Sequence, residues 1–123
     1  MPRFVVLFHK MPADSNRDDH WDFMLELDDS LATWALPQVP NQSGGVVAEP
    51  LSPHRKHYLD YEGPLSENRG EVSQWDAGTF AWLRRTDAEV RVQILGDELK
   101  GVATLKKVDC WHYQYEPSGE ESG

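Results

Sequence analysis

The segment HWDFMLE at residues 20–26 alternates polar and apolar residues, and Met24 is the one exception among the polar positions. Successive side chains of a β-strand point to opposite faces, so this alternation predicts a strand with one apolar face. The apolar face, which we expect to lie in a core, carries Trp21, Phe23 and Leu25. The opposite face carries His20, Asp22, Met24 and Glu26.

His20 and Asp22 place an imidazole and a carboxylate side by side, which is a simple beginning of a divalent-metal site. His9 ends the apolar run FVVLF at residues 4–8, which predicts a strand that could bring His9 to the same point. Two histidines and one aspartate leave coordination positions open for a substrate. A solvent-facing His–Asp pair, and a histidine that merely ends a buried strand, are the plainer alternatives.

The composition indicates one small globular domain. Its 123 residues include 39% hydrophobic residues and five tryptophans, which are enough for a modest core. The five apolar residues that follow Arg3 are too few for a signal-peptide core or a membrane span. Cys110 is the only cysteine and cannot form an intramolecular disulfide. We therefore expect a cytoplasmic protein with no membrane association.

The formal net charge of −9 argues against a protein that coats nucleic acid by bulk electrostatics. It does not exclude an enzyme that grips a strand end at a local site. Part of the charge lies in the segment EPSGEESG, for which we expect a disordered acidic tail at residues 116–123. The remaining residues, 1–115, are expected to form the folded domain.

Short alternating or apolar segments separated by turn residues follow one another along the chain. The predicted strands are residues 3–9, 20–27, 31–36, 46–48, 71–75, 78–84, 89–95, 98–107 and 110–115. Residues 53–60 could hold a helical turn. The pattern favours a mostly β fold, a single-domain antiparallel β-barrel of about eight short strands with one or two short helical turns. A barrel also removes exposed sheet edges.

The segment PHRKHY at residues 53–58 contains two imidazoles, two cations and a phenol. This chemistry suits an anionic substrate such as phosphate. A solvated basic loop that balances an acidic protein explains the spacing equally well. Arg69, in the loop segment ENRG, could add a phosphate contact, although its composition favours a surface position.

Several segments, taken in chain order, match the motifs of one known family. They are FVVLFH at 4–9, HWDFMLE at 20–26, LATWALP at 31–37, His54 and Tyr58 at a His-x-x-x-Tyr spacing, LDYEG at 59–63, WDAGT at 75–79 and LGDELKG at 95–101. Over roughly residues 3–115 the chain resembles the 3′-phosphoesterase domain of bacterial DNA ligase D and its stand-alone relatives.

This resemblance implies a catalytic divalent metal, usually manganese, whose ligands would be His9, His20 and Asp22. It implies that the later histidine and tyrosine contact the phosphate and support catalysis; these are His54 and Tyr58. Further phosphate contacts are expected from Arg55 and Arg69.

The implied activity is removal of a 3′-phosphate or a 3′-ribonucleotide from a nucleic-acid end during DNA repair by non-homologous end joining. The substrate would be the 3′ end of a DNA primer-template, and a repair ligase or polymerase is the implied partner. We expect a monomer.

The chain departs from the family where Met24 replaces an arginine and where an apolar residue near Val46 replaces a basic one. A guanidinium grips phosphate bidentately and a thioether does not. Arg17, Arg55 or Arg69 could substitute in space. Two other hypotheses stay open: a non-catalytic relative that binds metal, a strand end or a repair partner, and a metallohydrolase of small phosphoesters.

Overall fold

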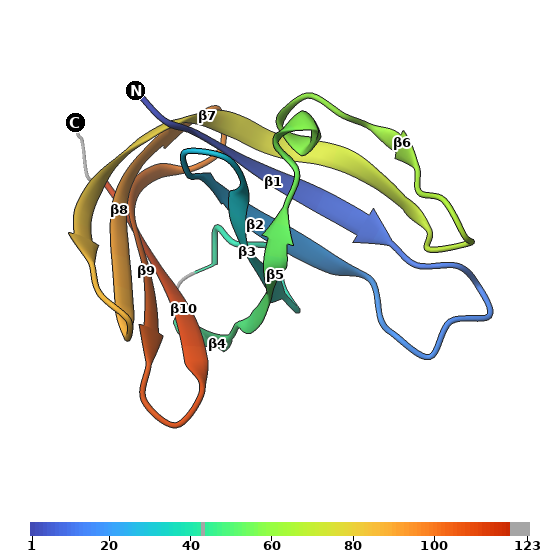
Figure 1. The fold of residues 1–123 in the computed structure, drawn as a ribbon. Helices are drawn as coiled ribbons and strands as arrows, with labels where there is room; N and C mark the ends of the chain where they lie inside the picture. Colours follow the sequence, from blue (N-terminus) through green and yellow to red (C-terminus); the bar gives the residue numbers. More distant parts are fainter. Residues whose placement is uncertain (43, 119–123) are drawn as a thin grey trace.

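The computed structural model describes residues 1–42 and 44–118, and it is almost entirely β (Figure 1). One 3₁₀ turn, η1, is the helical element among these residues. The elements are β1 (Arg3–Lys10), β2 (His20–Glu26), β3 (Leu31–Leu36), β4 (Val46–Val47), β5 (Glu49–His54), η1 (Lys56–Leu59), β6 (Gly63–Pro64), β7 (Glu71–Arg85), β8 (Glu89–Gly96), β9 (Lys100–Lys107) and β10 (Trp111–Pro117).

The strands form a nearly closed antiparallel barrel, as predicted. Their order is β4-β10-β9-β8-β7-β1-β2-β3-β5, and β6 adds a short pairing to β7. The two end strands, β4 and β5, are separated in sequence by Ala48 alone, whose N–H donates to the Trp111 carbonyl at 2.8 Å. The chain itself therefore spans the gap between the two edges of the sheet.

The main core fills the barrel and takes its β2 contribution from the apolar face of HWDFMLE. Phe23 and Leu25 are fully buried, and Trp21 is half-buried against the same core, as the alternation predicted. The segment EVRVQIL at residues 89–95 alternates in the same way, and its Val92 and Ile94 are buried in this core. Burial of these side chains is the main free energy that fixes which face of each strand points inward.

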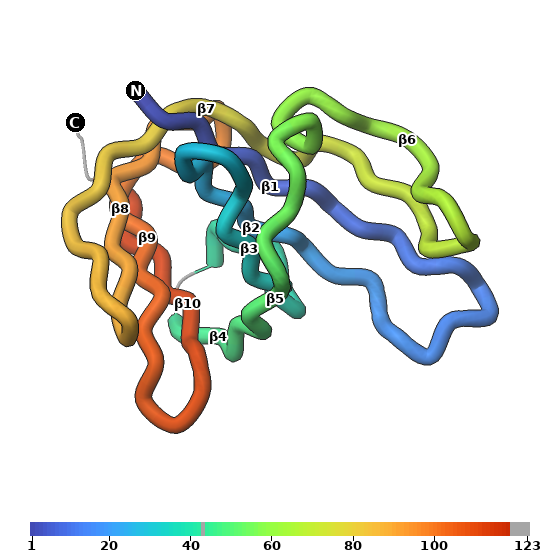
Figure 2. Tube along the Cα trace, viewed as in Figure 1, coloured from blue at the N-terminus to red at the C-terminus, as the bar shows by residue number. Residues whose placement is uncertain are grey.

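A second apolar cluster lies on the opposite face of β2, which differs from the prediction of a polar face. It contains Val5, Leu7, Met24, Leu31, Leu59 and Val72. The segment from β5 through η1 to β6 crosses this part of the sheet (Figure 2). Leu59 of η1 is 4% exposed and Met24 is 1% exposed. Met24 therefore belongs to the packing beneath η1, which explains an apolar residue at a position that otherwise looks polar.

Residues 71–85 form one strand, β7, where two strands were predicted on either side of Asp76 and Ala77. A bulge in the pairing with β1 falls at Trp75, because Val6 pairs with Asp76 and Leu7 with Gln74. Gly78 does not end the strand. A Cβ at this position would lie 2.1 Å from the Leu95 carbonyl oxygen, so glycine allows β7 and β8 to approach closely.

Two further differences are a strand that was not predicted and a later end of the last strand. Strand β5 was not predicted, because its sequence EPLSPH contains two prolines and lacks alternation, features that suit the edge position it occupies. Strand β10 extends to Pro117, two residues past the predicted domain boundary, because Glu116 and Pro117 pair with Val102 and Gly101 of β9. The predicted tail beyond Ser118 lies outside the described residues.

Asp76 is a buried carboxylate, 3% exposed, that holds the turn between β8 and β9. Its Oδ1 accepts hydrogen bonds from the N–H groups of Ala77 and Asp97 at 2.9 and 2.8 Å. Its Oδ2 accepts one from the N–H of Leu99 at 2.8 Å. The segment WDAGT therefore contributes to the fold by fastening this hairpin to β7.

Replacing this carboxylate leaves three backbone donors without their partner. We expect Asp76→Ala to lower the free energy of unfolding by about 3 kcal/mol, measured by urea denaturation followed through tryptophan fluorescence. Asp109→Ala, which removes an exposed carboxylate from the β9–β10 turn, is the control and should change it by less than about 0.5 kcal/mol. Equal small losses in both variants would contradict this role.

Candidate functional site

Strands β1 and β2 bring the three predicted metal ligands into one cluster. His9 pairs with His20 across the antiparallel ladder, and their ring centroids are 4.6 Å apart. Asp22 lies two residues from His20 and therefore points to the same face. One ligand atom from each of the three residues lies within 4.8 Å of the others. We call these three residues the His–Asp cluster.

His20 and Asp22 are buried and His9 is half-buried, and backbone carbonyls orient both histidines. His20 is 7% exposed and Asp22 3% exposed. The Nε2 of His9 lies 2.7 Å from the Arg69 carbonyl oxygen, and the Nδ1 of His20 lies 3.0 Å from that of Asp18. Because a carbonyl oxygen only accepts, each of these nitrogens carries a hydrogen and donates it. The other ring nitrogen of each histidine then faces Asp22.

Those two nitrogens lie close to the carboxylate: His9 Nδ1 is 3.3 Å from Asp22 Oδ2, and His20 Nε2 is 3.2 Å from Asp22 Oδ1. Oδ1 nevertheless accepts no well-aligned hydrogen bond and is a buried oxygen without a partner. A buried anionic oxygen without a hydrogen bond is costly unless a positive charge neutralises it. Two oriented imidazoles and one such carboxylate are a donor set that fits a divalent cation.

The pKa values of the cluster reflect the same contacts. The pKa of His9 is raised above its ordinary value of 6.5, mainly by the side-chain hydrogen bond with the Asp22 carboxylate. Burial of the ring opposes this effect. Burial by itself would raise the pKa of Asp22, but the two imidazoles outweigh it and hold this pKa below 3.8. The cluster therefore favours a carboxylate anion beside a positive charge.

The four predicted phosphate contacts all line a second feature, a groove of about 560 Å³ between β5, η1 and the loop before β7. We call it the basic groove; its predicted lining residues are His54, Arg55, Tyr58 and Arg69. Two further residues of its wall were not predicted, His57 and Tyr61, although His57 lies within the segment PHRKHY. Its lining includes two arginines and no carboxylate.

The aromatic rings of the groove pack on one another. His54 and Tyr58 have centroids 5.7 Å apart, and His57 lies 4.2 Å from Tyr58. The Nδ1 of His54 donates to the Ser52 carbonyl oxygen at 2.8 Å, which leaves its Nε2 for another partner. Within PHRKHY, Arg55 and His57 are exposed, whereas His54 and Tyr58 are half-buried, so the segment is a partly solvated wall of the groove.

His54 and the His–Asp cluster lie at different points along the sheet. His54 pairs with Leu31 of β3, whereas Asp22 pairs with Ala35, which is four residues or about 13 Å farther along that strand. Arg69 connects the two features. Its backbone carbonyl accepts a hydrogen bond from His9 Nε2. Arg69 also lines the groove, and its guanidinium donates to the carbonyl and hydroxyl oxygens of Ser66.

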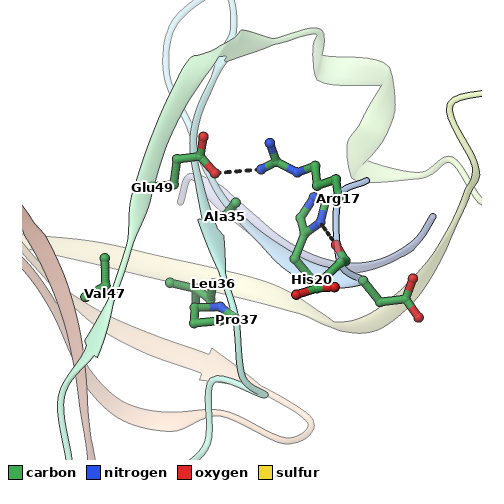
Figure 3. Close-up of a pocket in the computed structure, with 9 residues that line it drawn as sticks. Arg17, His20, Ala35, Leu36, Pro37, Val47 and Glu49 are labelled. Atoms are coloured by element: carbon green, nitrogen blue, oxygen red, sulfur yellow. Dashed lines mark hydrogen bonds and ion pairs between the residues drawn. The ribbon is translucent and has the colours of Figure 1, made fainter. Parts of the chain in front are cut away.

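A pocket of about 310 Å³ has His20 in its lining, together with residues of β3, β4 and β5 (Figure 3). We call it the side pocket. Val47 and Glu49 stand on one side of it and Arg17 and His20 on the other, while Leu36 and Pro37 form its floor. Arg17 reaches across the opening to Glu49, with a nitrogen–oxygen distance of 2.7 Å. Of the three arginines that could replace the one missing at Met24, Arg17 lies here and the other two lie in the basic groove.

Sequence comparison identifies the family. The family described as the DNA Ligase D 3′-phosphoesterase domain matches residues 12–107, which is more than half of the chain. The chain belongs to this family. His20, Asp22, His54 and Tyr58 lie within the matched range, whereas His9 precedes it and is brought beside His20 by the pairing of β1 with β2. Within the described part of the chain, no helix has the length and apolarity needed to cross a membrane.

Relatives of this domain occur in much longer proteins. The multifunctional non-homologous end joining DNA repair protein LigD of Mycobacterium tuberculosis is 33% identical over 106 residues, which cover 77% of this chain and 14% of that protein. The multifunctional non-homologous end joining protein LigD of Pseudomonas aeruginosa is 38% identical over 69 residues, which cover 52% of this chain and 8% of that protein. The chain thus spans a small part of the relatives that it matches.

The cluster makes the stability of the metal-free protein depend on pH. The contribution of His9, whose pKa is raised, is fully present below pH 6.5 and is lost as the pH rises through its folded-state value. The contribution of Asp22, whose pKa is lowered, is fully present above pH 3.8 and is lost as the pH falls. In EDTA, we expect the free energy of unfolding from urea denaturation to decrease from about pH 6 to about pH 9. The decrease should be smaller in Asp22→Asn, and equal slopes would contradict the assignment.

Proposed function

We propose that the chain is a divalent-metal-dependent phosphoesterase that removes a 3′-phosphate or a 3′-ribonucleotide from nucleic-acid ends in DNA repair. The observation that carries this proposal is the His–Asp cluster, in which two oriented imidazole nitrogens face an unpartnered carboxylate oxygen. Family membership supports the reaction class. Action in the cytoplasm, together with a repair ligase or polymerase, is part of the same proposal.

The His–Asp cluster would hold the cation through His9 Nδ1, His20 Nε2 and Asp22. Two imidazoles and a carboxylate leave coordination positions open for substrate, and manganese is the ion that the family resemblance implies. When bound, the cation would polarise a phosphoryl oxygen and offset the negative charge that develops there. The carbonyl oxygens of Asp18 and Arg69 would keep both rings in the tautomer that coordination requires.

The basic groove would bind the phosphate-bearing part of the substrate. Arg55 and Arg69 supply guanidinium groups, which match phosphate oxygens in pairs. Tyr58 supplies a hydroxyl donor to a phosphate oxygen. The free Nε2 of His54 could donate a proton to the leaving oxygen or a hydrogen bond to the phosphate. Because the backbone of His54 lies about 13 Å from the cluster along β3, proton donation to a phosphoryl group held at the cation would require the His54 side chain to extend toward the cluster.

A second candidate is binding of a metal or a strand end without turnover. The observation that favours it is Met24, which lies 1% exposed in the second apolar cluster and offers no charge to a phosphate. The net charge of −9 also weakens general attraction to nucleic acid. A metallohydrolase of small phosphoesters would need less basic surface and is distinguished by its substrate.

Turnover separates these candidates. With Mn²⁺, we expect cleavage of a 5′-labelled primer-template that ends in a 3′-phosphate or in one 3′-ribonucleotide, resolved by denaturing electrophoresis. His9→Ala removes a ligand and should lower the rate by at least about 100-fold. His112→Ala, which removes an exposed histidine from β10, should leave it unchanged. Binding of the end without cleavage would support the second candidate, and faster cleavage of a small aryl phosphate would support the third.

Metal affinity should depend on pH through His9. Since its raised pKa keeps the ring protonated to higher pH, Mn²⁺ must displace a proton, and its apparent affinity should fall by up to about tenfold for each pH unit below that pKa. Calorimetric titration at about pH 6 and about pH 8, in two buffers of different ionisation enthalpy, measures both the affinity and the proton release. Binding that is equally tight at both pH values would contradict His9 as a ligand.

A further inference from the structure

The side pocket adjoins the His–Asp cluster and shares His20 with it. The pairing register sets Asp22 beside Ala35 and Ala35 beside Glu49, so these residues form one row on the same face of the sheet. Neighbouring strands are about 4.8 Å apart, which places Glu49 about 10 Å from Asp22. Ala35, the small residue between them, leaves the hollow open. A substrate held at the cluster therefore has this pocket within the reach of one nucleotide.

The basic groove and the side pocket differ in the charge of their lining residues. The basic groove is lined by two arginines without a carboxylate. The side pocket is lined by three acidic residues, Asp18, Asp19 and Glu49, against one arginine, and the Asp19 carboxylate accepts the N–H of Met11. A phosphate is repelled by the second lining and attracted by the first. The side pocket therefore suits the uncharged portion of a nucleotide.

Its shape and chemistry fit a nucleoside. Its apolar lining comes from Ala35, Pro37 and Val47, because the Leu36 side chain is fully buried in the main core, and the rim carries the ion pair of Arg17 with Glu49. Glu49 holds the guanidinium of Arg17 across the opening, where its plane could stack on a base. Every base has such a face, so this contact would tolerate any sequence. The carboxylate of Glu49 is an acceptor for a sugar hydroxyl or an exocyclic amine.

We propose that the side pocket is a binding subsite for the terminal nucleoside of the nucleic-acid strand, with the base against Arg17 and the apolar lining. This inference rests on the proposed function, because it assumes that a strand end reaches the His–Asp cluster. It gives Arg17 a role in holding the base, which differs from a replacement for a phosphate-binding arginine at Met24.

The test uses Val47→Trp, which fills the pocket from an exposed wall residue that is 53% exposed and is not a metal ligand. Val108→Trp is the matched control, because Val108 is 71% exposed in the β9–β10 turn. The probe is a fluorescein-labelled primer-template with a deoxy 3′-hydroxyl end, measured by anisotropy in EDTA. This end carries no phosphate to remove, so binding is measured without turnover, and EDTA excludes any contribution of a bound metal.

We expect Val47→Trp to weaken binding of the probe by at least about fivefold, and Arg17→Ala to weaken it for all four terminal bases, while Val108→Trp changes it by less than about twofold. Equal affinities of Val47→Trp and Val108→Trp, or no binding by the parent protein, would overturn the proposal. Cleavage of the 3′-phosphorylated end by the parent is measured separately with Mn²⁺. If the parent protein binds the probe, Val47→Trp weakens that binding, and the parent does not cleave the 3′-phosphorylated end, the proposed activity is rejected and the pocket proposal stands.

Discussion

The antiparallel register between β1 and β2 is the constraint on which the rest of the site depends. It sets His9 opposite His20 and leaves Asp22 on the same face, two residues along β2. A slip of one residue would turn every side chain of β2 to the other face. Phe23 and Leu25 prevent that slip because they are fully buried in the barrel. The apolar face of β2 thus fixes the polar chemistry of its opposite face.

Burial makes the orientation of the cluster matter. The Asp22 carboxylate is withdrawn from water, so its charge depends on the two imidazoles or on a cation placed between them. The ring of His9 is fixed by the Arg69 carbonyl, which belongs to a loop where Glu67 and Asn68 both have positive φ angles of 61° and 54°. This loop also lines the basic groove, so one segment supports both His9 and the groove.

Met24 shows how packing and chemistry compete on one strand face. Its side chain completes the apolar cluster under η1, together with Leu59, and η1 presents Tyr58 to the basic groove. A guanidinium at this buried position would need a partner or a route to the groove. The arginines considered as replacements lie elsewhere, with Arg55 and Arg69 in the basic groove and Arg17 at the side pocket.

The sequence by itself predicted the barrel, the burial of Phe23 and Leu25, and the grouping of His9, His20 and Asp22, because the alternation of a strand is local and the apolar face that it marks selects the register with the neighbouring strand. It also placed His54 and Tyr58 close together, and the structure finds them at the end of β5 and in η1. Only the tertiary structure decided that the second face of β2 is buried and that Arg69, sixty residues away, orients His9. It alone opened the side pocket between Arg17 and Glu49. These features arise from contacts between distant segments, which no local pattern of residues encodes.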